Sequence, residues 1–152
     1  MLMTVHAIVG AAIGQQVDNI YLSFIIGFLS HFVLDLIPHG DSELIDGYYK
    51  KEKVRKMIGL VVIDAIAMAV LILLLFSYKS ADFTNKYSVI FGILGSILPD
   101  FIVGIAELSK KHFQNFYRFH TQIHTYIKKI NPTLFDGVIM QIIVLLLLME
   151  IL

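Results

Sequence analysis

A run of apolar residues from Met57 to Tyr78 constrains the fold of this chain more than any other feature. As a helix its 22 residues measure about 33 Å, enough to cross a hydrocarbon core about 30 Å thick. Its one charged side chain is Asp64, about two turns in. Apolar residues make up 57% of the 152 residues and charged ones 16%, and the mean hydropathy is +0.78. Soluble domains contain about 45–50% apolar and about 25% charged residues, so the sequence predicts an integral membrane protein.

Further segments with apolar or amphipathic patterns surround this run. We expect helices over Thr4–Gln16, Ile20–Ile37, Tyr87–Leu108, Ser109–Asn131 and Thr133–Leu152. The first is too short to span a bilayer, and its Gly10 and Gly14 predict close packing against another helix. Pro99 is expected to interrupt its helix, and the segment from Ser109 is basic and aromatic. The prediction is one all-α domain, residues 1–152. It is an integral membrane bundle of about five to six helices: four spans, a short N-terminal helix and a cytoplasmic amphipathic helix.

The distribution of basic residues predicts the orientation. Ten of the twelve Lys and Arg lie in two segments, residues 50–56 and 110–129. The positive-inside rule makes both segments cytoplasmic, in a prokaryotic-type inner membrane. A net charge of zero removes the global electrostatic case for nucleic acid, and we expect no cleavable signal peptide. Since the chain has no cysteine, a metal site would use nitrogen and oxygen ligands.

The stretch SHFVLDLIPHGD, residues 30–41, concentrates potential metal ligands. His31 and Asp35 are four residues apart, which places them one turn apart on one helix face. Pro38 ends the helix, so His39 and Asp41 can fold back toward them. Polar groups at membrane depth are costly and usually functional. This stretch therefore predicts a metal site, with a hydrogen-bonded structural cluster as the alternative.

The predicted orientation brings ligand-type residues from other helices to the same cytoplasmic leaflet. They are His6, Asp64, Asp100, His120 and His124. Each also has a simpler interpretation: a packing or proton-relay group for Asp64, a helix end for Asp100, and interfacial histidines for the late pair. We expect His112 and Glu107 to be surface residues, and Asp136 lies near the start of the last helix.

Imidazole and carboxylate ligands suit zinc, with manganese or iron as alternatives. Two or three ions would account for the number of ligands. Paired ions favour phosphoester hydrolysis because they activate water and neutralise the charge on phosphoryl oxygens.

Four pieces of the sequence resemble one family: VHAIVGAAIG, HFVLDLIPHGD, the LPD ending at Asp100, and FHTQIHT. This is the family of small membrane-bound metal-dependent hydrolases related to zinc-dependent phospholipase C and P1-type nucleases. The resemblance covers most of the chain and implies an all-helical fold with zinc ions that cleave phosphodiesters. The ligands that it implies are His6, His31, Asp35, His39, Asp100, His120 and His124.

We therefore expect a hydrolase that acts on a phospholipid or another membrane amphiphile from the cytoplasmic side. Asp64 or Asp41 would serve as the base or would orient a ligand. The alternative is a metal-binding membrane protein without hydrolysis, either a transporter or a scaffold.

Overall fold

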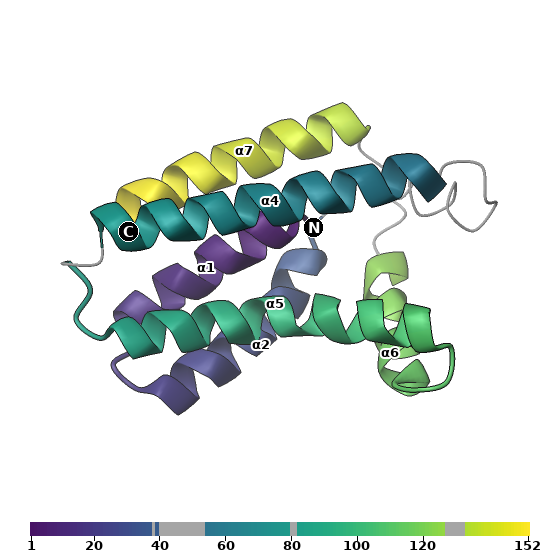
Figure 1. Cartoon of the computed structure of the whole chain (residues 1–152), viewed down its shortest axis with the longest axis horizontal. Helices are drawn as coiled ribbons and strands as arrows, with labels where there is room; N and C mark the ends of the chain where they lie inside the picture. The colour runs from purple at the N-terminus through teal and green to yellow at the C-terminus, as the bar shows by residue number, and fades with distance from the viewer. Residues whose placement is uncertain (38, 40–53, 80–81, 127–132) are drawn as a thin grey trace.

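Figure 1 shows the computed structural model of this chain, which is all-helical in the residues that it describes: 1–37, 39, 54–79, 82–126 and 133–152. The six described helices are α1 (Met3–Gln16), α2 (Ile20–Asp35), α4 (Val54–Tyr78), α5 (Lys86–Ser109), α6 (Gln114–Tyr126) and α7 (Leu134–Ile151). The predicted all-α class is confirmed for this part of the chain. The predicted helices differ from the observed ones mainly at their ends.

Helix α5 runs without a break through Pro99, so the predicted interruption there is wrong. A proline inside a helix removes one backbone hydrogen bond and crowds the carbonyl four residues before it. However, α5 packs along both α1 and α2, and Pro99 is fully buried. Tertiary packing therefore keeps the helix continuous where the local sequence disfavours it.

The segment predicted as one amphipathic helix from Ser109 is instead the end of α5, a turn, and α6. Lys110 and Phe113 have left-handed backbones, with φ of 52° and 59°. A left-handed residue just after the last helical turn is a common way for a helix to end. The prediction of a single helix is therefore wrong at its start, and residues 127–132 lie outside the described ranges.

Helices α1, α2 and α5, which we call the inner helices, approach one another at the level of their backbones. A Cβ atom on Gly10 or Gly27 would collide with the backbone carbonyl of Gly92. A Cβ atom on Gly14 would collide with the carbonyl of Ser88. This confirms the close packing that the spacing of Gly10 and Gly14 predicted.

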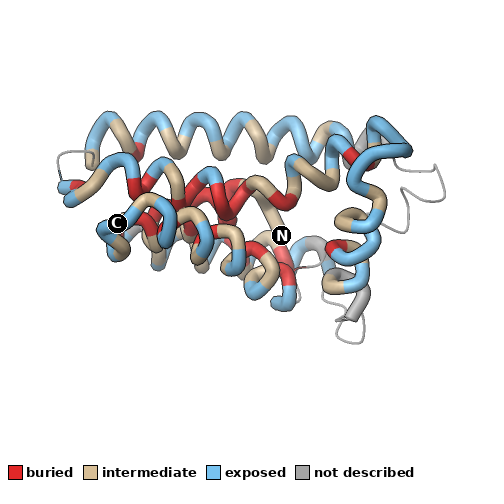
Figure 2. The backbone as a smooth tube through the Cα atoms, turned by 90° about the horizontal axis from the view of Figure 1, so that it is seen from below, coloured by how far each residue is buried: buried red, intermediate tan, exposed pale blue. Residues whose placement is uncertain are grey.

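The buried residues gather along the inner helices, as Figure 2 shows. The apolar core consists of Ala7, Ile8, Ala11, Leu75, Phe83, Val89, Ile93, Ile97 and Leu152. Several polar side chains are just as deeply buried: His6, Ser23, His31, Asp35, Ser88 and Ser96. The interior of this protein therefore contains a polar part, and that part includes the predicted ligands.

Helices α4 and α7, which we call the outer helices, each pack on α1. Two described helices are long and apolar enough to cross a membrane, Ile58–Tyr78 within α4 and Lys86–Ser109, which is α5. Only 6% of the apolar window of α4 is buried, against 44% of that of α5. The apolar parts of α2 and α7 are shorter, so two of the four predicted spans reach the required length here.

Candidate metal centre

His31 and Asp35 lie on one face of α2, as their spacing predicts. Nε2 of His31 is 3.1 Å from Oδ2 of Asp35, and neither side chain is exposed to solvent. A carboxylate buried in this way is costly unless it is paired or binds a metal ion. The partners of Asp35 come from α1 and α6 as well as from α2.

Helix α6 brings His120 to this pair. Nε2 of His120 is 3.0 Å from Nε2 of His31 and 3.2 Å from Oδ2 of Asp35. The three atoms form a triangle with sides of 3.0, 3.1 and 3.2 Å. Ligands about 2.0–2.1 Å from a tetrahedral zinc ion lie about 3.3 Å from one another. The spacing of these ligand atoms therefore fits a zinc ion.

Phe32 holds α6 against α2 beside this triangle. Its ring contacts those of Phe116 and Phe119, with centroids 6.2 and 5.5 Å apart. It also contacts the ring of His120 at 6.2 Å. Because Phe32 directly follows His31, this aromatic packing sets the position of His120 relative to His31.

Ser96 of α5 makes hydrogen bonds to two of the histidines, one to a ring and one to a backbone. Its backbone carbonyl accepts a hydrogen bond of 2.8 Å from Nδ1 of His31, which leaves Nε2 of the neutral ring with a lone pair. Its hydroxyl donates to the backbone carbonyl of His6 at 2.7 Å. Ser96 was not predictable from the sequence, because a single serine in an apolar helix carries no pattern of its own.

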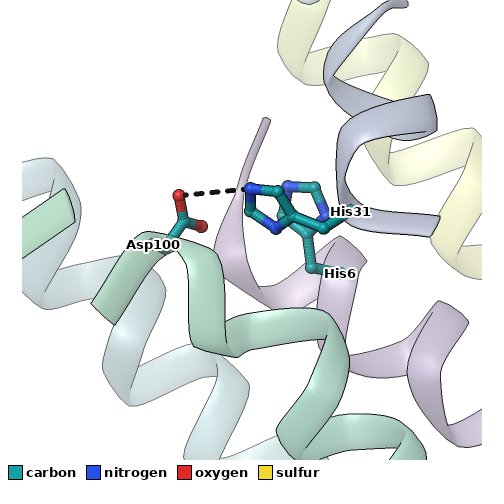
Figure 3. Close-up of side chains that lie close together, drawn as sticks. All are labelled: His6, His31 and Asp100. Carbon is teal, nitrogen blue, oxygen red and sulfur yellow. Dashed lines mark ion pairs between the residues drawn. The ribbon is translucent and has the colours of Figure 1, made fainter. Parts of the chain in front are cut away.

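His6 and Asp100 complete the cluster, and Figure 3 shows them beside His31. The rings of His6 and His31 are stacked, with centroids 4.1 Å apart, and Nε2 of His6 is 3.2 Å from Oδ1 of Asp35. Oδ1 of Asp100 is 3.7 Å from Nε2 of both His31 and His120. Two groups of three potential ligands thus share His31. We call these residues the His/Asp centre: His6, His31, Asp35, Asp100 and His120.

The state of His6 also fits a metal ligand. Both ring nitrogens are buried, and within the described part of the chain the 3.2 Å contact of Nε2 with Oδ1 of Asp35 is the polar contact that they make. Burial lowers the pKa of His6 from its ordinary 6.5 to about 4, although the neighbouring Asp35 raises it. The ring is therefore neutral near pH 7, which is the form that binds metal ions.

His39 is buried beside the centre but belongs to neither of the two ligand groups found among the described residues. Its Nδ1 is 2.7 Å from the carbonyl of Ile37, and its Nε2 is 2.7 Å from the amino group of Met1. That amino group is 3.0 Å from Oδ1 of Asp35. His39 therefore neighbours the centre through the amino group, and its role as a ligand stays a prediction.

Asp64 of α4 lies beside the N-terminus of α1, and it belongs to neither ligand group found among the described residues. Its carboxylate accepts hydrogen bonds from the backbone N–H groups of Met3, at 2.6 Å, and Thr4, at 3.2 Å. These contacts favour a structural role. The role of Asp64 as a base stays a prediction that this geometry does not support.

The remaining predicted residues lie away from the centre or outside the description. Asp41 lies outside the described residues, and His124 lies in α6 without a described side chain. His112 is exposed, as expected, whereas Glu107 is half-buried. Asp136 forms a capping box with Thr133 at the start of α7.

Comparisons of the chain with models of protein families, with curated proteins and with solved structures find no match. The fold and the site define an all-α protein with two potential membrane-spanning helices and a cluster of His and Asp that could hold a metal ion. Any more specific function is a proposal that rests on this geometry.

Proposed function

We propose that this protein is a metal-dependent hydrolase of phosphoester bonds, with a phospholipid or another membrane amphiphile as its substrate. The observation that supports it most is the buried triangle of His31, Asp35 and His120 nitrogen and oxygen atoms, with sides of 3.0–3.2 Å. The proposal agrees with the resemblance to membrane-bound relatives of zinc-dependent phospholipase C.

The donor set suits zinc first, with manganese or iron as alternatives. His31 and His120 face Oδ2 of Asp35, whereas His6 faces Oδ1. Oδ1 also faces the amino group of Met1, so Oδ2 is the oxygen of Asp35 that would hold an ion together with His31 and His120. Divalent ions would supply Lewis acidity and lower the pKa of a water molecule.

The exposure of the centre supports a catalytic role. The side chain of Asp100 is 24% exposed, whereas the side chains of Asp35 and the three histidines are 0–7% exposed. When most ligands are buried and one side chain is accessible, a substrate group can reach the metal site from that side. Structural zinc sites, in contrast, are usually closed by four protein ligands. Asp100 is therefore where we expect the phosphoryl group to approach.

A four-span bundle with its site at the cytoplasmic leaflet agrees with the charge distribution. Nδ2 of Asn85, just before α5, donates to Oδ1 of Asp18, just after α1, at 3.0 Å. The two turns that are poor in basic residues therefore meet at one end of the molecule, where the positive-inside rule predicts an outer face. The basic residues 50–56 would attract anionic headgroups on the cytoplasmic side.

One observation favours the alternative, a metal-binding scaffold without catalysis. Four of the five side chains of the centre are almost completely buried, as in a site that only stabilises its fold. A transporter would need polar residues on the far side, and among the described residues Ser23 and Ser88 are the buried polar ones near the outer ends of α2 and α5.

Metal analysis of the purified protein, followed by a screen of lipid phosphoesters, tests the proposal. We expect one or two zinc ions per chain, and hydrolysis that a chelator abolishes. Losing a hydrogen-bond partner of a ligand costs about 10–100-fold in metal affinity, so His120→Ala should cost at least that much. Gln122→Ala, on the exposed side of α6, is the matched control.

Each result separates the candidates. Unchanged zinc content in both His120→Ala and Asp35→Ala would remove the triangle from the metal site. Bound zinc that stabilises the fold, without hydrolysis of any phosphoester in the screen, would favour the scaffold.

A further inference from the structure

The N-terminus of α1 is not capped by its own sequence. Leu2 occupies the capping position and makes no side-chain hydrogen bond to the first turn, which also lacks an acidic residue. The first N–H groups of any helix have no partner within the helix, and burying them without one is costly. The partners in this protein come from the two outer helices.

Asp64 of α4 supplies the first part of this cap. Its Oδ2 accepts the N–H of Met3 at 2.6 Å, and its Oδ1 accepts the N–H of Thr4 at 3.2 Å. The hydroxyl of Thr4 also donates to Oδ1 and to the backbone carbonyl of Asp64. A carboxylate is favoured at this position because the helix dipole places partial positive charge at the N-terminus.

Gln141 of α7 supplies the second part. Its Oε1 accepts the N–H of Leu2 at 2.6 Å, and its Nε2 donates to the carbonyl of Gly137 at 3.1 Å. The side chain is 3% exposed, in a helix whose neighbouring residues are almost all apolar. Its polar groups thus serve the end of α1 and its own helix.

The end of α1 is also where the His/Asp centre begins. His6 follows Thr4 by two residues, so it lies in the same helical turn as the capped groups. A shift of that turn would move the His6 ring away from Asp35 and from its stack on His31. The hydrogen bonds from the outer helices thus end two residues before His6 in the same helical turn.

We propose that Asp64 and Gln141 are positioning residues, which dock α4 and α7 onto the N-terminus of α1 and thereby hold His6 in the metal centre. This inference rests on the proposed metal-dependent function. It replaces the predicted role of Asp64 as a base with a role in shaping the site.

The test compares Asp64→Asn with Leu75→Ala in the full chain, reconstituted in lipid nanodiscs. Asn keeps the shape of Asp but offers one acceptor oxygen to two N–H donors. Leu75 is buried near the C-terminus of α4, eleven residues after Asp64, so Leu75→Ala destabilises α4 without touching the cap. Zinc affinity is measured by competition with a chelator, and the visible spectrum of Co²⁺ reports the coordination geometry.

We expect Asp64→Asn to weaken zinc binding about 10-fold or more and to change the Co²⁺ spectrum. Leu75→Ala should lower the thermal stability by a similar amount but leave the zinc affinity and the Co²⁺ spectrum unchanged. Gln141→Met should act in the same direction as Asp64→Asn, and it replaces that variant if Asp64→Asn does not fold. Equal affinities in Asp64→Asn and wild type, or equal losses in the two α4 variants, would overturn the proposal.

Hydrogen exchange separates this proposal from the proposed function. The amides of Leu2, Met3 and Thr4 should be protected in wild type and in Leu75→Ala, and should exchange faster in Asp64→Asn. Unchanged protection in Asp64→Asn overturns the docking role, even if zinc binds as expected. Faster exchange in a protein that binds no zinc confirms the cap, overturns its role in the metal centre, and contradicts the proposed function.

Discussion

The inner helices of this protein hold most of its buried polar residues, whereas the outer helix α4 leaves most of its apolar surface exposed. In the inner helices, glycines let backbones touch, and polar residues such as His31 and Ser96 are completely buried. In the outer helix α4, apolar residues such as Val70 and Leu73 are 49% and 67% exposed. Soluble proteins rarely leave large apolar surfaces uncovered. The length and the exposed apolar surface of α4 are those of a helix that could cross a lipid bilayer.

The way in which the two parts are joined differs as well. The inner helices meet where glycines let their backbones touch. The outer helices pack on α1 through apolar residues and add hydrogen bonds from two polar side chains, Asp64 and Gln141. Lipid tails are as apolar as the side chains of a membrane helix, so apolar contacts alone do little to fix where two such helices pack. Hydrogen bonds between the helices fix that position.

The largest effect is expected from a charge in the middle of α4. If its exposed face lies in lipid, Val70→Asp should cost about 3 kcal/mol or more of membrane insertion. Leu108→Asp is the control, because Leu108 is 88% exposed but lies at the end of α5. The measurement is the fraction of chain recovered in the membrane. Equal recovery of the two variants would show that water, not lipid, covers α4.

A methyl group between the inner helices should have the next largest effect. In Gly92→Ala the new Cβ would meet the backbone carbonyl of Gly10, which cannot rotate away. We expect a loss of about 1–3 kcal/mol in the free energy of unfolding. Gly59→Ala is the matched control, since a Cβ there meets nothing within 4 Å. The control should be neutral or more stable by up to about 1 kcal/mol, because glycine weakens a helix.

Thermal unfolding of both glycine variants at several zinc concentrations checks this prediction. If Gly59→Ala destabilised the protein as much as Gly92→Ala, the close approach of the inner helices would not explain the effect.

Local patterns in the sequence predicted the features that depend on neighbours along the chain. The four-residue spacing of His31 and Asp35 and that of Gly10 and Gly14 each correspond to one helix face. The contact between His31 and Asp35 follows from helix geometry alone, whereas the shared face of Gly10 and Gly14 predicted the approach of another helix without identifying it as α5. Asn19 likewise accepts from two N–H groups at the start of α2, close to the predicted start of that helix.

Features that depend on distant residues were not predictable in the same way. A single Asp64 in an apolar run is compatible with a base, a proton relay or a docking group, and its partners lie about 60 residues earlier. Pro99 predicted a break that does not occur, because the packing that maintains α5 comes from other helices. Gln141 and Ser96 carried no signal, since their roles require the positions of Leu2 and His31.

The smallest predicted effect concerns the end of the inner helices opposite the His/Asp centre. Oδ1 of Asn85 accepts from the N–H groups of Tyr87 and Ser88, and its Nδ2 donates to Asp18. Replacing a capping Asn by Ala costs about 1 kcal/mol. Asn85→Ala should lower the free energy of unfolding by this amount and by a few tenths of a kcal/mol more. The second part is small because the hydrogen bond to Asp18 is exposed to solvent.

Asn19→Ala provides the comparison, because Asn19 caps α2 through the N–H groups of Tyr21 and Leu22. The difference between the two variants in the free energy of unfolding therefore measures the link between the two turns. Combining Asn85→Ala with Asp18→Ala in a double-mutant cycle isolates that link. A coupling near zero would mean that packing between the glycines, and not the hydrogen bond between the turns, holds this end together.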